Sequence, residues 1–311
     1  MLELSEENRA CADRCLISFR EQVIAFFSKA NKPVPEEVLH KTETYDLQWL
    51  ISRYAELLMC QIVKRPRIVL VSKILEEKLQ ASPEWKTFFA IIKQKCIDGE
   101  DLNPHTSKSG FRWKVKINPG NKGYLYQRDQ QTLYGVRHLH LSETILNGKA
   151  ERSDFLLYVF FKGNFAYFLD VLPHCDGVWH DKHFVEIMES NWPNVRIRFP
   201  GKAYLCLEDG TRVEPTPEDL EMCIRNGITT AISVGDNLYP FWDGCSADTS
   251  SQNAVRKANA VHNTLMKQFF LSQEKGYQIS TCRLSPDLTK MFLFDRKGRL
   301  LAYDDIPISL A

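Results

Sequence analysis

Two apolar runs joined by a short polar turn constrain the fold of this chain more than any other feature. The runs are Phe155–Phe161 and Phe165–Leu172, and Lys162-Gly163-Asn164 joins them. Short, nearly continuous apolar runs bounded by a turn are typical of strands that are covered on both faces. A glycine in the connection supplies the positive φ that a tight hairpin requires. The sequence therefore predicts an antiparallel hairpin at the centre of a sheet.

The segment before this hairpin carries histidines in alternation with leucines. Between Leu133 and Leu141, His138 and His140 stand two residues apart, and Arg137 precedes them. Successive side chains of a strand point to opposite faces. We therefore expect both imidazoles on one face and the neighbouring leucines in the core. Such a strand would mount two titratable groups on a rigid surface.

The chain up to Asn103 has the periodicity of helices. Apolar residues recur at helical spacing in four segments, Leu16–Phe27, Leu47–Leu58, Pro66–Leu79 and Trp85–Cys96. Pro66 is placed to open the third helix, and Ser82 to cap the fourth. Four helices with short connections predict a small helical bundle.

The periodicity changes after Asn103, where strand patterns begin. Further on, a long helix is expected over Ser250–Lys275, and strands are expected from Tyr277 to Tyr303. We predict fold class α+β, with a helical N-terminal domain over 1–103 and an α+β domain built on a central antiparallel sheet over 104–311.

The overall composition excludes several classes of protein. The net charge of +1 gives no global attraction to nucleic acid, and no apolar run approaches the roughly 20 residues that cross a bilayer. The acidic N-terminus lacks the pattern of a signal peptide. Nine cysteines without a CxxC pair are typical of reduced thiols. The P-loop, the dinucleotide-binding glycine motif and GxSxG are absent from the sequence. We expect a cytoplasmic protein with no membrane segment.

Positive charge is nevertheless concentrated in one stretch of the sequence. Between Pro104 and Ser153 there are nine Lys or Arg residues and three Asp or Glu residues. A local basic patch attracts anionic partners. The candidate nucleic-acid-binding residues lie in the alternating segment 111–117 and the turn after it: Arg112, Lys114, Lys116 and Lys122. The alternative is a solvated strand face without a ligand.

Polar side chains in or beside the apolar strands are candidates for catalysis. They are Arg137, His138, His140, Arg152, Tyr158 and His174. An imidazole can take the proton of a ribose 2′-hydroxyl, a second group can protonate the leaving oxygen, and arginine can stabilise the charge on the phosphate. This chemistry requires neither a metal nor a cofactor. The alternative is that the histidines are structural.

A metal site is a rival interpretation of the same region. The region offers imidazole and carboxylate ligands for zinc or manganese. They are His138, His140, His174 and Asp176, together with His180 and His183 at helical spacing. The sequence contains no HExxH motif, and the HxH pair alone is common.

Three segments resemble the central β-meander of RelE-type ribonuclease toxins. The segments are 133–141, 152–161 and 165–174. The basic and tyrosine residues of the family have rough counterparts in Arg137, in Arg152 with Tyr158, and in His174. The interval from Arg152 to Tyr158 is longer than in the family pattern, and Pro173-His174 replaces the terminal basic pair. The segment His138–Leu141 and the Asn-Trp-Pro segment at 191–193 are also similar to segments of uncharacterised bacterial proteins.

The RelE resemblance implies an endoribonuclease that needs no metal, in a bacterial toxin or phage-defence role. RNA would then be a partner, and the N-terminal helices would regulate the protein or bind a protein partner or inhibitor. Two alternatives stay open: a non-catalytic component that binds nucleic acid or protein, and a His-ligated, metal-dependent hydrolase.

Overall fold

The chain forms two compact units. The computed structural model describes residues 6–39, 47–82, 84–106, 135–173, 182–225, 231–241 and 251–306, with residues 111, 113 and 228. Met1–Cys60 and Ser250–Leu310 form one unit, here called the discontinuous unit, and Gln61–Thr249 form the central unit. This division does not coincide with the boundary expected at residue 103, because the helices between Gln61 and Asn103 belong to the central unit.

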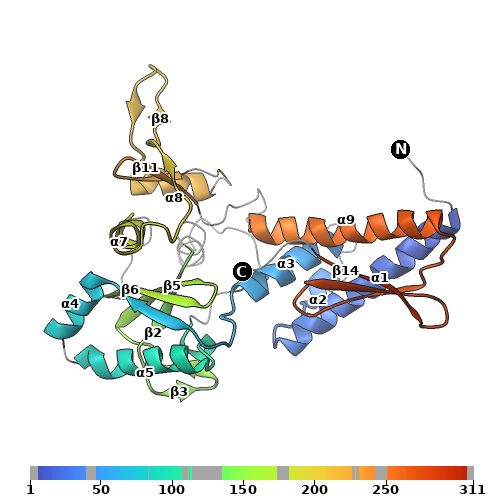
Figure 1. Cartoon of the computed structure of the whole chain (residues 1–311), viewed down its shortest axis with the longest axis horizontal. Helices are drawn as coiled ribbons and strands as arrows, with labels where there is room; N and C mark the ends of the chain where they lie inside the picture. Colours follow the sequence, from blue (N-terminus) through green and yellow to red (C-terminus); the bar gives the residue numbers. More distant parts are fainter. Residues whose placement is uncertain are drawn as a thin grey trace. The chain divides into compact units, whose positions relative to one another are not determined.

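Helices and a small sheet make up the discontinuous unit (Figure 1). Its elements are α1 (Glu6–Lys29), α2 (Glu36–Leu39), α3 (Leu47–Met59), α9 (Gln252–Glu274), β12 (Thr281–Leu284), β13 (Lys290–Phe294) and β14 (Leu300–Asp305). The helices α1, α3 and α9 pack on one another, and α1 also packs on β12 of the antiparallel sheet β12-β13-β14. Phe19, Leu50 and Leu265 are buried at the centre of this packing.

The start of α9 is fixed by a buried polar network. Arg53 and Glu56 form an ion pair on α3. The other carboxylate oxygen of Glu56 accepts a hydrogen bond of 2.6 Å from the backbone N–H of Ser251. The Ser251 hydroxyl caps the helix by accepting from the N–H of Ala254 at 3.1 Å. The network joins two segments that are far apart in the sequence.

The central unit contains the remaining elements. Its helices are α4 (Lys73–Ala81), α5 (Glu84–Asp98), α7 (His183–Asn191), α8 (Pro217–Arg225) and the 3₁₀ turn η1 (Asn103–His105). Its longer strands are β1 (Ile68–Val71), β2 (Val136–His140), β5 (Phe155–Lys162), β6 (Phe165–Pro173), β10 (Ala231–Val234) and β11 (Asn237–Pro240). Its short strands are β3 (Ile145–Leu146), β4 (Lys149–Ala150), β7 (Phe199–Pro200), β8 (Leu205–Cys206) and β9 (Arg212–Val213).

The predicted hairpin lies at the centre of a four-stranded sheet with the order β1-β6-β5-β2. Strands β2, β5 and β6 form an antiparallel meander, and β1 adds to β6 in the parallel direction. Gly163 has φ 55° in the turn between β5 and β6, as expected for a short hairpin connection. The fold class is α+β, as predicted from the sequence.

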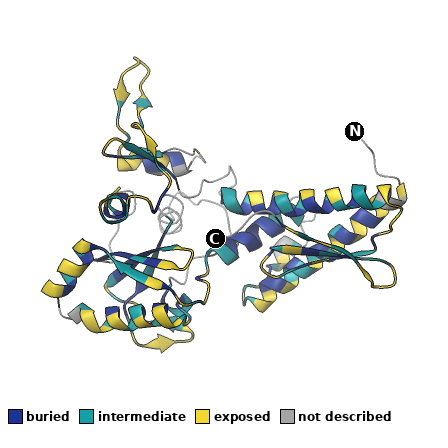
Figure 2. Cartoon of the chain, in the orientation of Figure 1, coloured by how far each residue is buried: buried dark blue, intermediate teal, exposed yellow. Residues whose placement is uncertain are grey.

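Helices cover one face of this sheet, here called the α5 face. Leu139, Leu157 and Val159 on the strands pack there against side chains of α4 and α5, among them Leu79 and Phe89. Figure 2 shows α5 with exposed residues on one side and buried residues on the other, the pattern of a helix that lies on a sheet.

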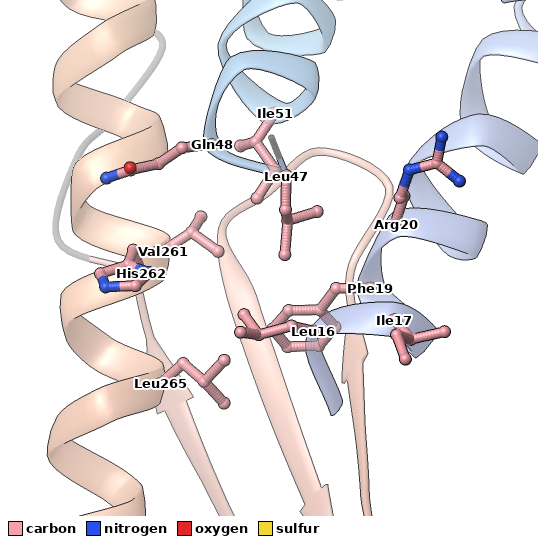
Figure 3. Close-up of a pocket in the computed structure, with 10 residues that line it drawn as sticks. All are labelled: Leu16, Ile17, Phe19, Arg20, Leu47, Gln48, Ile51, Val261, His262 and Leu265. Carbon is pink, nitrogen blue, oxygen red and sulfur yellow. The ribbon is translucent and has the colours of Figure 1, made fainter. Parts of the chain in front are cut away.

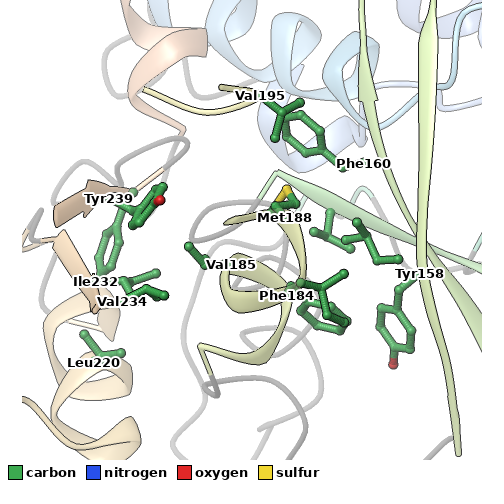
Figure 4. Close-up of a cluster of buried hydrophobic side chains, with 14 of the residues drawn as sticks. Tyr158, Phe160, Phe184, Val185, Met188, Val195, Leu220, Ile232, Val234 and Tyr239 are labelled. Atoms are coloured by element: carbon green, nitrogen blue, oxygen red, sulfur yellow. The ribbon is translucent and has the colours of Figure 1, made fainter. Parts of the chain in front are cut away.

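The opposite face, here called the α7 face, is covered by the helix α7, and other described residues cover the far side of that helix. In Figure 4, Phe184 and Met188 of α7 point toward Tyr158 and the strand β5, whereas Val185 points toward β10 and β11. Those two strands form a second antiparallel sheet with β7. The sheet β1-β6-β5-β2 is therefore buried on both faces, as the apolar runs predicted.

The expected helix over Pro66–Leu79 is wrong in its first half. Ile68–Val71 is the strand β1, and α4 begins only at Lys73 after the N-cap residue Ser72. The periodicity of a four-residue apolar run does not distinguish a helix from a strand. Here Ile68–Val71 forms a strand because it pairs with β6. The expected four-helix bundle is also wrong, because α4 and α5 pack on the sheet of the central unit.

Candidate active site

A row of polar side chains crosses the α7 face of the central sheet. His138 on β2 is directly opposite Tyr158 on β5, and Tyr158 is directly opposite Asp170 on β6. Directly opposed residues of antiparallel strands project from the same face. The rings of His138 and Tyr158 are 6.2 Å apart, and Tyr158 and Asp170 are fully buried. The strands thus align three groups capable of hydrogen bonding.

Asp170 is the centre of the hydrogen bonding in this row. Its two carboxylate oxygens accept bonds of 2.8 and 2.9 Å from the ammonium group of Lys78. Oδ2 is also 2.9 Å from Nε2 of His183, and Oδ1 accepts from the backbone N–H of Val171 at 2.8 Å. A buried carboxylate costs several kcal/mol of desolvation unless it is paired in this way. The carboxylate of Asp170 is fully enclosed, whereas its partners Lys78 and His183 are partly exposed to solvent.

The start of α4 brings Lys78 to this carboxylate. The register of β1 on β6 ends at Val71 opposite Phe168, so β1 does not cover Asp170. Ser72 then donates its N–H to the Phe168 carbonyl at 3.0 Å and its hydroxyl to the Leu169 carbonyl. The same hydroxyl caps α4 by accepting from the N–H of Leu75 at 3.2 Å. The helix therefore begins beside the edge of β6.

His183 approaches Asp170 from the first residue of α7. The hydrogen bond to a carboxylate assigns the proton of the neutral imidazole to Nε2, which leaves Nδ1 as the basic nitrogen. The side chains of His183 and Lys78 are 28% and 33% exposed, whereas that of Asp170 is not exposed. A partly exposed histidine that is oriented by a buried carboxylate has the arrangement of a general base.

The structure confirms the predicted strand and the shared face of the two histidines. His138 and His140 lie on β2 with ring centroids 6.2 Å apart, and Leu139 is buried on the other face. His140 is itself buried, and its Nδ1 accepts a long hydrogen bond of 3.4 Å from the N–H of Ser153. His138, which is half-buried, is the more accessible of the two.

A further histidine braces the end of β2 from the α5 face. His105 in η1 is fully buried, and its Nδ1 is 3.2 Å from the carbonyl oxygen of His140. Its Nε2 is 3.1 Å from the ammonium group of Lys95. Burial, and then the charge of Lys95, hold the pKa of His105 below its usual value. The neutral ring thus donates through Nδ1 and accepts through Nε2, a structural role.

Two of the other predicted site residues, Arg137 and Arg152, lie away from the row. Arg137 alternates with His138, so its side chain leaves β2 on the α5 face. Arg152 is exposed in the loop before β5. His174 lies outside the described residues, as do the four candidate nucleic-acid-binding residues Arg112, Lys114, Lys116 and Lys122.

Sequence reasoning missed Asp170 and Lys78, and it considered His183 only as a metal ligand. One signal was available: Asp170 is the single charged residue in the apolar run Phe165–Leu172. A charge in a strand that is buried on both faces requires partners. Lys78 carried no such signal, because a lysine on an amphipathic helix is ordinarily solvated.

Two further observations bear on the classes of function considered above. Within the described ranges, no group of three or more His, Cys, Asp or Glu residues is arranged to hold a metal ion, and His174, Asp176 and His180 lie outside those ranges. None of the described helices is long and apolar enough to cross a membrane. Comparisons with models of protein families, with curated proteins and with solved structures found no match to this chain.

Proposed function

We propose that the central unit is an acid–base catalytic domain that cleaves RNA, with His183 as the general base. The observation that carries the proposal is the pair formed by His183 and the buried carboxylate of Asp170. In this proposal Asp170 is a positioning residue that fixes the tautomer and orientation of His183 and stabilises its protonated form. Lys78 offsets the negative charge of Asp170 in the resting site.

The proposed reaction is an internal transfer at a phosphodiester. Nδ1 of His183 takes the proton of the ribose 2′-hydroxyl while that oxygen attacks the phosphorus. The bond from phosphorus to the 5′-oxygen breaks, and a second acid gives this oxygen a proton. We assign the second role to His138, because it is on the same face and half-buried. The products are a 2′,3′-cyclic phosphate and a 5′-hydroxyl end, and no oxidant or water is consumed.

Two features of the sequence support RNA as the substrate. The stretch from Pro104 to Ser153, which contains β2, carries nine basic and three acidic residues. The strands β2, β5 and β6 fall largely within the three segments that resemble the RelE-type ribonuclease toxins. A role in a toxin or phage-defence system belongs to the same proposal.

The decisive experiment measures cleavage of a fluorescently labelled oligoribonucleotide by the whole chain. His183→Gln keeps a donor for Asp170 but removes the base, and we expect the rate to fall by about 100-fold or more. His262→Gln, the same change in the discontinuous unit, is the matched control and should leave the rate unaltered. An all-DNA oligonucleotide should resist cleavage, since it lacks the 2′-hydroxyl. Equal rates for the wild type and His183→Gln would refute the assignment.

A chelator separates this proposal from metal-dependent hydrolysis. Acid–base cleavage should persist in EDTA, whereas loss of activity in EDTA and its recovery with zinc or manganese would establish the metal-dependent alternative. Binding of the oligonucleotide without cleavage under either condition would instead establish a non-catalytic binding component.

The basic segment offers a separate test of substrate binding. Replacing Lys114 and Lys116 with Gln removes two charges from the alternating segment 111–117. If these residues contact phosphates, the affinity for RNA should fall. The slope of log affinity against log salt concentration should also become shallower, by about the amount that two phosphate contacts contribute. Fluorescence anisotropy over a salt series measures both quantities. An unchanged salt slope would contradict a role for these lysines.

A further inference from the structure

The discontinuous unit contains a pocket that the proposed function does not use. Three helices from distant parts of the sequence form it, and its volume is about 340 Å³. Figure 3 shows Leu16 and Phe19 of α1, Leu47 of α3, and Val261 and Leu265 of α9 around this space. The volume falls in the range of about 300–1,000 Å³ that is usual for small-molecule sites. The apolar walls suit the hydrocarbon part of a ligand.

The polar groups at the pocket are basic or neutral. Arg20, Gln48 and His262 are its polar lining residues, and none of the described lining residues is an Asp or a Glu. Arg20 is half-buried and donates one hydrogen bond of 3.0 Å to the Leu39 carbonyl. A guanidinium group has five donors, and the bond to the Leu39 carbonyl uses one of them. Gln48 is bound to Asn259 of α9 at 2.9 Å, which links two walls of the pocket.

We propose that this pocket binds a small amphiphilic carboxylate, whose apolar chain lies between α1, α3 and α9 and whose anionic head pairs with Arg20. Apolar walls with a cation at the rim are complementary to a molecule of that kind. A guanidinium binds a carboxylate through two parallel hydrogen bonds, which a hydroxyl head group cannot reproduce. The site is distinct from the polar row of the central unit, and its existence does not depend on the proposed ribonuclease activity.

Binding should stabilise the discontinuous unit, because the ligand would contact all three of its long helices. A ligand that binds only the native state raises the melting temperature in a concentration-dependent manner. The effect should appear with decanoate and be much smaller with decanol, which has the same chain and no charge. These two compounds are the probes, and isothermal titration calorimetry with each measures the affinity directly.

Two variants of the whole chain test the two halves of the site. Arg20→Met retains the aliphatic stem and removes the charge, and we expect decanoate to bind about tenfold more weakly while decanol is unaffected. Arg9→Met, at an exposed position of the same helix, is the matched control and should bind decanoate as the wild type does. Leu16→Trp fills the pocket and should abolish binding of both probes.

The outcomes decide the proposal in either direction. Selective binding of decanoate that Arg20→Met removes and Arg9→Met preserves would support it. Absence of binding, equal affinity for decanoate and decanol, or an equal loss in the two arginine variants would overturn it. Circular dichroism establishes whether Leu16→Trp folds, and if it does not, the comparison of Arg20→Met with Arg9→Met still decides the result.

Discussion

At the scale of single residues, the central unit depends on two buried titratable groups that have opposite roles. Asp170 accepts hydrogen bonds from donors on two helices and the backbone, and it orients His183. His105 is enclosed without a carboxylate partner and braces the end of β2. Asp170 thus connects the core to the partly exposed His183, and His105 holds the end of β2 in place.

His105 makes the stability of the protein depend on pH in a defined direction. Its pKa in the folded state is below the value of roughly 6.5 expected in the unfolded chain. Above that pH the ring is neutral in both states. As the pH falls below it, the unfolded chain takes up the proton first, so stability declines until the folded pKa is reached.

We therefore expect the wild type to lose more stability between pH 7.5 and pH 5.5 than His105→Gln does, by on the order of 1 kcal/mol. Glutamine retains a donor and an acceptor but does not titrate. Urea unfolding at the two pH values measures the difference. An identical pH dependence in the two proteins would show that His105 does not control this transition.

At the scale of elements, the junction of α5 and β1 explains why Pro66 does not begin a helix. The N–H of Arg67 donates to the carbonyl of Cys96 at the end of α5, at 3.0 Å. Gly99 follows α5 with φ 75°, and a Cβ atom there would lie 2.5 Å from the nitrogen of Pro66. The chain before β1 is thus pressed against the end of α5, and Pro66 lies in that contact.

This junction predicts unequal costs for two glycine substitutions. Gly99 and Gly148 both have positive φ, at 75° and 74°, but a Cβ atom at Gly148 would meet nothing within 4 Å. Gly148→Ala should therefore cost only the conformational penalty of about 1 kcal/mol. Gly99→Ala adds a clash with backbone atoms and should cost a further 1–3 kcal/mol or so. Thermal or urea unfolding of both variants measures the costs, and equal values would contradict the close packing at Pro66.

The elements also show what could be predicted from the sequence. The meander was predictable, because Phe155–Phe161 and Phe165–Leu172 are long, nearly continuous apolar runs and Gly163 marks the turn between them. The strand Ile68–Val71 was not, because four apolar residues fit either a helix or a strand and its partner β6 is nearly a hundred positions away. The site was predictable only in part for the same reason. Local alternation placed the two histidines of β2, but only the fold brings Lys78 and His183 to Asp170.

At the scale of the whole molecule, the two units differ in how their residues are distributed along the sequence. The central unit is continuous in sequence, whereas the discontinuous unit combines the first 60 residues with residues from 250 onward. Apolar periodicity marked α1 and α3 as amphipathic, but it could not indicate that their faces pack on α9 and β12. The domain boundary expected at residue 103 followed the change in periodicity and therefore missed this pairing.

The division predicts an asymmetric response to truncation. A chain ending at residue 249 lacks α9 and the sheet β12-β13-β14, so Phe19 and Leu50 lose the partners that bury them. We expect α1 and α3 to lose protection from hydrogen exchange, while β5 and β6 keep theirs because their core lies entirely within the central unit. Hydrogen–deuterium exchange measured by mass spectrometry distinguishes the segments. Protection of α1 in the truncated chain would contradict the division.

The discontinuous unit also has a consequence for biosynthesis. Synthesis proceeds at about 5–20 residues per second, so α1 leaves the ribosome roughly 10–50 s before α9 follows it. During this interval the central unit can fold, whereas the apolar face of α1, which includes the thiols of Cys11 and Cys15, still lacks α9 and β12, two of the elements that cover it. The nascent chain therefore carries a partly uncovered apolar helix with two thiols until its last segment is made, and we expect it to depend most on chaperones during this period.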